Sequence, residues 1–246
     1  MRATPARMIT VFSQILALLV SLQNAETQPI LNGPEPAHEV RVVELFTSQG
    51  CPMCPGANEL LAAIGETDGD VLAIAYGVDY WDVYGWEDTF AMEAFTARQQ
   101  AYVHAGDAHR VYTPHFVING APEKIRFSEA RVRQAVAEAS GLPALINAET
   151  ETGAITIRID GPPRETPATV WLVAYHPGVE TRLIEDGPNA GREMVHYNMA
   201  RDVTALGPWT GGPAEFNAEP PAAELAAAIL VQDGPGGRIL SAARVD

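Results

Sequence analysis

The sequence predicts an α/β fold followed by a β-rich C-terminal module. Between residues 40 and 142, apolar runs of strand length alternate with segments whose apolar residues recur at helical spacing. After Gly141-Leu142-Pro143 the chain changes to short alternating runs separated by glycine and proline, which is typical of antiparallel strands in a sandwich. We therefore expect one domain over residues 40–142 and an antiparallel, sandwich-like module over residues 144–246.

The predicted elements of the first domain follow in the order strand, helix, strand, helix, strand, strand, helix. Pro52, directly after Cys51, suits a first helical position because its missing N–H has no partner there. This order is that of a thioredoxin fold. The expected ranges are strands at 40–46, 71–78, 115–119 and 124–127, a helix opening at the cysteines and running to 64, and helices at 89–105 and from 128 to 139.

The C-terminal module is predicted to contain strands only. Turn sequences such as Gly-Pro-Pro and Asp-Gly-Pro separate its apolar runs, and no period of 20 to 50 residues repeats. The expected strands lie at 154–160, 168–176, 181–185, 193–203, 225–232 and 239–245.

The N-terminus has the layout of a signal peptide. Arg2 and Arg7 precede a mostly apolar run over residues 8–22, which is shorter than the about 20 residues that a spanning helix needs. We expect cleavage after Ala25, so that 1–25 is the signal peptide, and a Pro-rich linker over 26–39. Gln23 is not the small residue preferred two positions before a cleavage site, so an uncleaved anchor is the alternative. The mature chain should have no membrane span and a periplasmic or secreted location.

The charge balance argues against a nucleic acid partner. Lys and Arg total 16 against 31 Asp and Glu, and the net charge of −15 repels phosphate backbones and anionic headgroups.

Cys51 and Cys54 are the only cysteines, and they stand three positions apart where a helix is expected to begin. The N–H groups and dipole of a helix N-terminus stabilise a thiolate, so Cys51 is the expected attacking thiol and Cys54 the resolving thiol. The alternative is an inert disulfide, although so short a loop adds little stability. A closed zinc site needs four ligands, and two thiols do not complete it.

Several motifs together resemble a known family. They are Val43-Glu44-Leu45-Phe46-Thr47-Ser48-Gln49-Gly50-Cys51-Pro52-Met53-Cys54-Pro55, Val78-Asp79-Tyr80-Trp81-Asp82, Phe95-Thr96-Ala97-Arg98-Gln99, Tyr112-Thr113-Pro114, Asn119-Gly120 and Asn189-Ala190-Gly191-Arg192. The chain resembles the secreted thioredoxin-like family designated domain of unknown function 1223. The resemblance implies a thioredoxin fold with a Cys-x-x-Cys site and no established substrate.

The thioredoxin resemblance also implies roles for three further residues. Thr113-Pro114 would be a cis peptide bond beside the cysteines, with the Thr113 backbone pairing with an extended substrate. Glu44 would be the counterpart of the buried carboxylate that accepts the proton of the resolving thiol. The alternative for Glu44 is a side chain that faces solvent.

Two polar segments leave alternatives open. Residues 79–88 combine aromatic and acidic side chains after a predicted strand. They form either a recognition surface, or a structural segment whose aromatic side chains pack against the C-terminal module and whose acids cap the next helix. Asn189-Ala190-Gly191-Arg192 forms either a tight turn or a contact with the first domain.

The sequence therefore supports two functions of different classes. The first is an exported thiol–disulfide oxidoreductase, without a cofactor, that exchanges disulfides with a protein partner. The second is a copper-binding module in which Cys51, Cys54 and His115 hold the metal, since thiolates favour Cu(I) and imidazole suits Cu(II). A fold that serves only as a scaffold for the β-rich module is a third reading.

Overall fold

The computed structural model describes residues 39–106, 110–122, 127–151 and 153–245. The predicted signal peptide and all of the predicted linker but its last residue lie outside this range. The helices are α1 (Cys54–Thr67), α2 (Glu93–Ala105) and α3 (Glu129–Glu138), with short 3-10 turns η1 (Asp82–Tyr84) and η2 (Gly187–Asn189). The strands are β1 (Arg41–Thr47), β2 (Val71–Gly77), β3 (His115–Ile118), β4 (Ala121–Pro122), β5 (Ile146–Glu151), β6 (Ala154–Ile159), β7 (Ala168–Leu183), β8 (Glu193–Trp209), β9 (Ala214–Ala218), β10 (Ala226–Gln232) and β11 (Ile239–Arg244).

The fold is mixed α/β, and one large sheet joins the two parts predicted from the sequence. Its eight strands have the order β11-β10-β7-β8-β2-β1-β3-β4. β1 is parallel to β2 and antiparallel to β3. β8 is parallel to β2, but the two strands pair only at Ala75 and Met199. Strands from residues 40–142 and from residues 144–246 therefore share one hydrogen-bonded sheet.

The helices lie on opposite faces of β1, whose side chains alternate between the two faces. Val43 and Leu45 pack with apolar residues of α1 and α3. Val42 and Phe46 pack with Phe95 and others on α2. Every residue of β1 after Arg41 is buried, as expected of a strand covered on both faces.

A second sheet covers one face of the C-terminal strands. Its order is β5-β6-β9, and Ile155, Ile157 and Ile159 of β6 form a common core with Val170 of β7 and Ile229 of β10. β5 and β9 were not expected from the sequence, because the many small and polar residues in INAETE and AEFNA obscure the alternation typical of a strand.

Several predicted boundaries are wrong. α1 begins at Cys54, so Pro55 and not Pro52 occupies its first turn. α2 begins at Glu93 rather than residue 89, because Ala91 forms a β-bridge with Gly77. The return strand after β3 is Ala121–Pro122, and residues 124–126 of the predicted strand 124–127 lie outside the described range.

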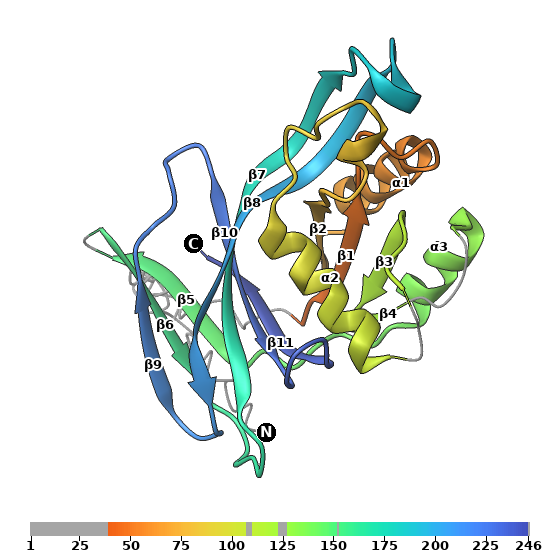
Figure 1. Ribbon diagram of the computed structural model, residues 1–246. Helices are drawn as coiled ribbons and strands as arrows, with labels where there is room; N and C mark the ends of the chain where they lie inside the picture. The colour runs from red at the N-terminus through yellow and green to blue at the C-terminus, as the bar shows by residue number, and fades with distance from the viewer. Residues whose placement is uncertain (1–38, 107–109, 123–126, 152, 246) are drawn as a thin grey trace, which may run out of the picture. The chain divides into compact units, whose positions relative to one another are not determined.

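β7 and β8 are much longer than predicted. The sequence suggested separate strands at 168–176 and 181–185, but β7 is one strand that runs through both. Register shifts at three points let it continue beside β8. Figure 1 shows this hairpin passing β2 and extending up beside α1, and both strands contact that helix.

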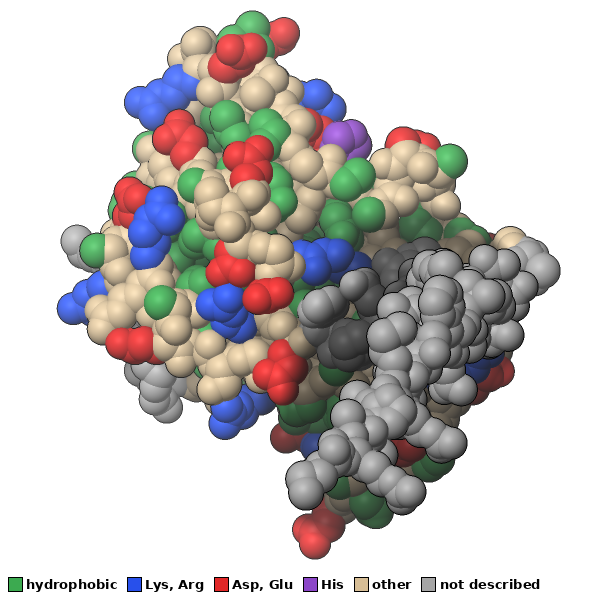
Figure 2. All heavy atoms as spheres, turned by 180° about the vertical axis from the view of Figure 1, so that it is seen from behind, with side chains coloured by type: hydrophobic (Ala, Val, Ile, Leu, Met, Phe, Trp, Pro, Cys, Tyr) green, Lys and Arg blue, Asp and Glu red, His purple; other side chains and the backbone are tan. Residues whose placement is uncertain are grey.

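Charged side chains of both signs lie on the face that Figure 2 shows. Figure 2, a view from behind, shows acidic side chains scattered among basic ones rather than gathered in one patch. No helix within the described residues has the length and apolar character to cross a membrane.

Candidate functional site

The two cysteines lie where the chain turns from β1 into α1. The N–H of Cys51 donates to the carbonyl of Ser48 at 3.1 Å, and the N–H of Cys54 donates to the carbonyl of Cys51 at 3.1 Å. Both thiols are free, and the residues are 1% and 0% exposed. The expected position at the start of a helix is confirmed for Cys54, whereas Cys51 sits one turn before the first helical residue.

The environment lowers the pKa of the Cys51 thiol to about 7. The largest cause is the hydrogen bond with the Cys54 side chain, and bonds from the Thr113 side chain and from the backbone N–H groups of Met53 and Cys54 add to it against the opposing effect of burial. A thiol with this pKa is substantially ionised near neutral pH, which is the state that attacks a disulfide.

The pKa of Cys54 is raised well above its ordinary value. Burial is the largest cause, followed by the hydrogen bond to Cys51 and by the negative charge of the Cys51 thiolate. The order of acidity within the pair therefore agrees with the roles expected from the sequence. The accessibility of Cys51 does not agree with its expected role as the exposed thiol, because Cys51 is almost as deeply buried as Cys54.

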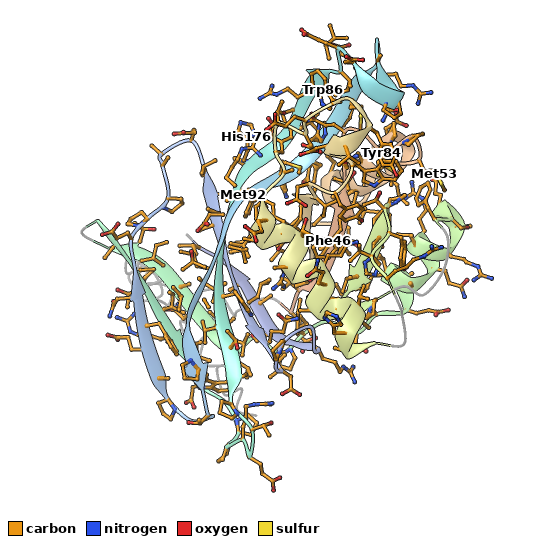
Figure 3. The ribbon with its side chains drawn as sticks, in the orientation of Figure 1. Phe46, Met53, Tyr84, Trp86, Met92 and His176 are labelled. Atoms are coloured by element: carbon orange, nitrogen blue, oxygen red, sulfur yellow. The ribbon has the colours of Figure 1, made fainter. Side chains whose placement is uncertain are left out.

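Side chains from the far end of the β7–β8 hairpin cover the thiols. Ile184 and Met194 form a buried cluster with Cys51 and Cys54, and Trp81 and Trp86 pack against it. We call these four covering side chains the cysteine cover. Figure 3 shows Trp86, Tyr84 and Met53 at one end of the molecule, the end at which this hairpin terminates. The cover comes from two segments distant in sequence, and the sequence analysis did not find Ile184 or Met194.

Asn189 links the hairpin tip to the cysteine turn. Its side-chain Nδ2 donates to the carbonyls of Gln49, at 2.8 Å, and Cys51, at 2.9 Å, while its Oδ1 has no partner among the described residues. Asn189 is 1% exposed and lies in a tight turn in which Gly191 has a φ of 78°. Both alternatives for this motif therefore hold, since it is a turn and also a contact with the first domain.

The acid Asp88 holds the same turn from the other side. Its Oδ2 accepts from the N–H of Gln49 at 2.7 Å, and its Oδ1 accepts from the N–H of Phe90 at 2.8 Å. Burial raises the pKa of Asp88 to about 6 despite these bonds. The prediction that acids in 79–88 cap a helix is thus wrong for Asp88, which supports the cysteine turn, because α2 begins only at Glu93.

Thr113 and Pro114 join the site as expected. The peptide bond between them is cis, as the resemblance implied. Thr113 Oγ1 accepts from Trp81 Nε1 at 2.7 Å, which leaves the hydroxyl hydrogen free to donate to the Cys51 sulfur. The structure therefore brings together Cys51, Cys54, Thr113 and Pro114.

Glu44 lies on the other side of β1. It neither faces solvent, since it is 0% exposed, nor meets the cysteines. Arg98 Nε donates to its Oε1 at 2.8 Å, and the Tyr102 hydroxyl donates to its Oε2. Strand alternation explains this placement, because Thr47, three residues later, faces Asn58 of α1 with a bond of 2.8 Å.

His115 also lies away from the thiols. Its ring packs against Phe46 and Tyr112, and its Nδ1 lies 3.3 Å from Gln99 Nε2. Burial lowers the pKa of this imidazole to about 4. Within the described residues no three His, Cys, Asp or Glu side chains are grouped in a way that could hold a metal ion, so the structure does not gather the predicted copper ligands.

Comparisons with known proteins bear on the family and the fold. The family profile described as "Protein of unknown function (DUF1223)" matches residues 42–232. The crystal structure of protein AGR_C_4864 from Agrobacterium tumefaciens is similar at 30% identity and a TM-score of 0.67, over 85% of this chain and 95% of that one. HBP35 of Porphyromonas gingivalis is similar in fold at 15% identity and a TM-score of 0.57, over 85% of this chain and 75% of that one. A search of curated proteins found no match.

Proposed function

The chain belongs to the DUF1223 family of proteins of unknown function, and we propose that it is a thiol–disulfide oxidoreductase in which Cys51 attacks and Cys54 resolves. The observation that carries the proposal is a pair of free, neighbouring thiols at the start of α1, of which Cys51 is held by hydrogen bonds from Cys54, Thr113 and the backbone N–H groups of Met53 and Cys54. The pKa of Cys51 is lowered to about 7 and that of Cys54 is raised. A structural pair of cysteines does not require a difference in pKa between its thiols. Thiol–disulfide exchange requires one thiolate that attacks and one protonated thiol that resolves the mixed disulfide afterwards.

In the first step the Cys51 thiolate attacks one sulfur of a substrate disulfide. A Cys51–substrate disulfide forms, the substrate S–S bond breaks, and the other substrate sulfur leaves as a thiolate that takes a proton from water. The hydrogen bonds from Cys54, from Thr113 and from the backbone N–H groups keep a substantial fraction of Cys51 ionised at neutral pH.

In the second step Cys54 attacks the sulfur of Cys51. Once the mixed disulfide has formed, Cys51 no longer carries a negative charge. One of the causes that raise the pKa of Cys54 is therefore removed. Contacts with Thr47 and Ser48, which lower the Cys54 pKa, remain. The Cys54 proton passes to the departing substrate sulfur, the Cys51–Cys54 disulfide forms, and the substrate leaves reduced by two electrons. The reverse sequence oxidises a dithiol.

The arrangement of the first part of the chain supports a thioredoxin-like fold. The strands β2-β1-β3-β4 are neighbours in that order, α1 and α3 cover one face, α2 covers the other, and the cis bond precedes β3. The signal-peptide layout of the N-terminus supports an exported protein, whose compartment permits disulfide chemistry.

A protein partner fits the surroundings of the site. Exposed apolar side chains border it at Met53 between the cysteines, at Val83 and Tyr84 in η1, and at Leu183 beside Ile184. Such a surface is typical of one that binds other chains. Because Cys51 is 1% exposed, a partner disulfide reaches it only after the cysteine cover shifts.

Trapping of the mixed disulfide tests the proposal. Oxidised glutathione serves as the probe, and products are identified by mass. Cys54→Ser should accumulate a glutathione adduct on Cys51, the unaltered protein should pass through it to the internal disulfide, and Cys51→Ser should react at least tenfold more slowly. Faster adduct formation on Cys54 than on Cys51 would reverse the roles. Absence of any adduct would remove the exchange function.

A further inference from the structure

A cavity of about 490 Å³ lies between α2 and the C-terminal strands, on the face of the sheet opposite α1. Its volume is within the range of small-molecule sites. Small apolar side chains form part of its walls, including Ala97 and Ala101 on α2 and Val203 on β8. None of the cysteine-site residues lines it, so the cavity is separate from the exchange chemistry.

Arg98 lines this cavity, and its guanidinium has more N–H groups than the three that donate hydrogen bonds. Its side chain is 5% exposed. Nε donates to Glu44, Nη1 donates to Gln232 Oε1 at 3.2 Å, and Nη2 donates to the Tyr102 hydroxyl at 3.2 Å. A guanidinium has five N–H groups, so these three bonds leave two N–H groups, and the Tyr76 hydroxyl lies close to the same guanidinium.

Trp171, also in the cavity wall, adds a further donor. Its indole Nε1 is buried and has no hydrogen-bond partner among the described residues. The Arg98 guanidinium carbon lies 5.5 Å from the centre of the same ring, which places the two donor-bearing groups against each other. A buried N–H without an acceptor is energetically unfavourable, because it has lost its hydrogen bond to water.

The amide of Gln232, which lines the cavity, is already committed. Gln232 Oε1 accepts from Arg98, and Gln232 Nε2 donates to Tyr102 at 3.0 Å and to the Gly237 carbonyl at 2.8 Å. The cavity therefore combines apolar wall residues with a buried indole N–H that Gln232 does not satisfy.

We propose that this cavity binds a small, uncharged, mostly apolar molecule through a carbonyl oxygen that accepts from Trp171 Nε1 and Arg98. The carbonyl supplies the missing acceptor, and the apolar body fills the space between the alanines of α2 and β8. A neutral ligand fits better than an anion, because Glu44 already balances the charge of Arg98 and the chain as a whole has a net charge of −15.

Two probes of matched shape test the role of the carbonyl. 1-Indanone carries a ketone on a fused ring, and indane is the same ring system without the oxygen. The readout is the indole ¹H–¹⁵N signal of Trp171 in the full chain, assigned by its loss in Trp171→Phe. 1-Indanone should shift that signal saturably, and indane should bind at least tenfold more weakly. Equal affinities, or no shift of Trp171 with millimolar 1-indanone, would overturn the proposal.

Two substitutions on α2 locate the site. Ala97→Phe fills the cavity from an exposed wall position and should abolish the shift. Ala105→Phe, exposed on the same helix but outside the cavity, should leave it unchanged. If Ala97→Phe binds 1-indanone normally, the ligand lies elsewhere and the proposal fails. Cys51→Ser should bind as the unaltered protein does, so failure here is separate from failure of the exchange function.

Discussion

The cysteine turn and the Glu44 cluster are both buried beside β1, but they use burial in opposite ways. In the Glu44 cluster the carboxylate accepts from Arg98 and Tyr102, and Gln232 completes the network. At the cysteine turn the donors converge on one sulfur, Cys51, whose thiolate has no counter-cation among the causes that shift its pKa. In the Glu44 cluster a fixed opposite charge balances the buried charge, whereas at the cysteine turn hydrogen bonds alone stabilise the thiolate, as the proposed exchange function requires.

The largest expected effect comes from unbalancing the Glu44 cluster. Glu44→Gln leaves the Arg98 charge buried without its carboxylate, so the free energy of unfolding should fall by about 3–5 kcal/mol. Denaturant titration measures the loss. The pKa of Cys51, from the pH dependence of iodoacetamide alkylation, should not change. Glu44→Gln with Arg98→Met should recover part of the stability. A shift in the Cys51 pKa would instead make Glu44 part of the cysteine site.

The next effect concerns His115, on the same face as Glu44. Its pKa of about 4 lies below its ordinary 6.5, so the folded state favours the neutral ring. The stability that this ring contributes is present above about pH 6.5 and is lost as pH falls toward 4, by about 3 kcal/mol. His115→Gln should reduce the loss of stability over this interval, measured by denaturant titration at several pH values. The pKa of His196 is also lowered to about 4, so the part of the pH-dependent loss of stability that comes from His196 should remain in this variant.

The same variant addresses the copper hypothesis. Since His115 packs among Phe46, Tyr112 and Gln99, His115→Gln should leave both exchange with glutathione and the affinity for Cu(I) within about twofold of the unaltered protein. A loss of Cu(I) affinity by orders of magnitude would instead require His115 to be a ligand, as expected of a site that loses one of three donors.

A smaller effect is expected at Asn189, which joins the hairpin to the cysteine turn. Asn189→Ala removes two hydrogen bonds, and although the Cys51 carbonyl still accepts from the N–H of Cys54, the Gln49 carbonyl loses this donor, so stability should fall by about 2 kcal/mol. The cysteine cover should also open more readily, so alkylation of Cys51 at a fixed thiolate fraction should be faster. Arg192→Ala, exposed in the same turn, is the control and should change neither quantity. Unchanged alkylation in Asn189→Ala would mean that the hairpin tip does not limit access.

The smallest effect concerns Thr113. Thr113→Val keeps the shape but removes the hydroxyl that donates to Cys51, so the pKa of Cys51 should rise by about one unit, equivalent to about 1.4 kcal/mol. Thr113→Ser keeps the hydroxyl and should stay near the unaltered value. The rate of thiolate alkylation against pH gives the pKa for both variants. An equal rise in both variants would assign the effect to packing rather than to the hydrogen bond.

Local sequence signals determined the order of elements in the first part of the chain and the placement of Cys54 at a helix start. Apolar runs such as 71–78 and turn residues such as Asn119-Gly120 act through neighbouring residues, so they can be read from a short window. The face of the strand on which Glu44 lies, relative to that of Thr47, also follows from strand alternation. Thr47 faces α1, and an odd separation along a strand puts Glu44 on the other face.

Only the tertiary structure decided what surrounds the thiols and the cavity. Ile184, Asn189 and Met194 reach the cysteine turn because β7 and β8 continue past β2, and no local pattern fixes how far paired strands extend. The cavity needs α2 and β7, β8 and β10 at the same time. Contacts between segments more than a hundred residues apart depend on how whole faces of strands and helices pack together. The pattern of a single sequence predicts which face of an element is apolar but not which other element packs against it.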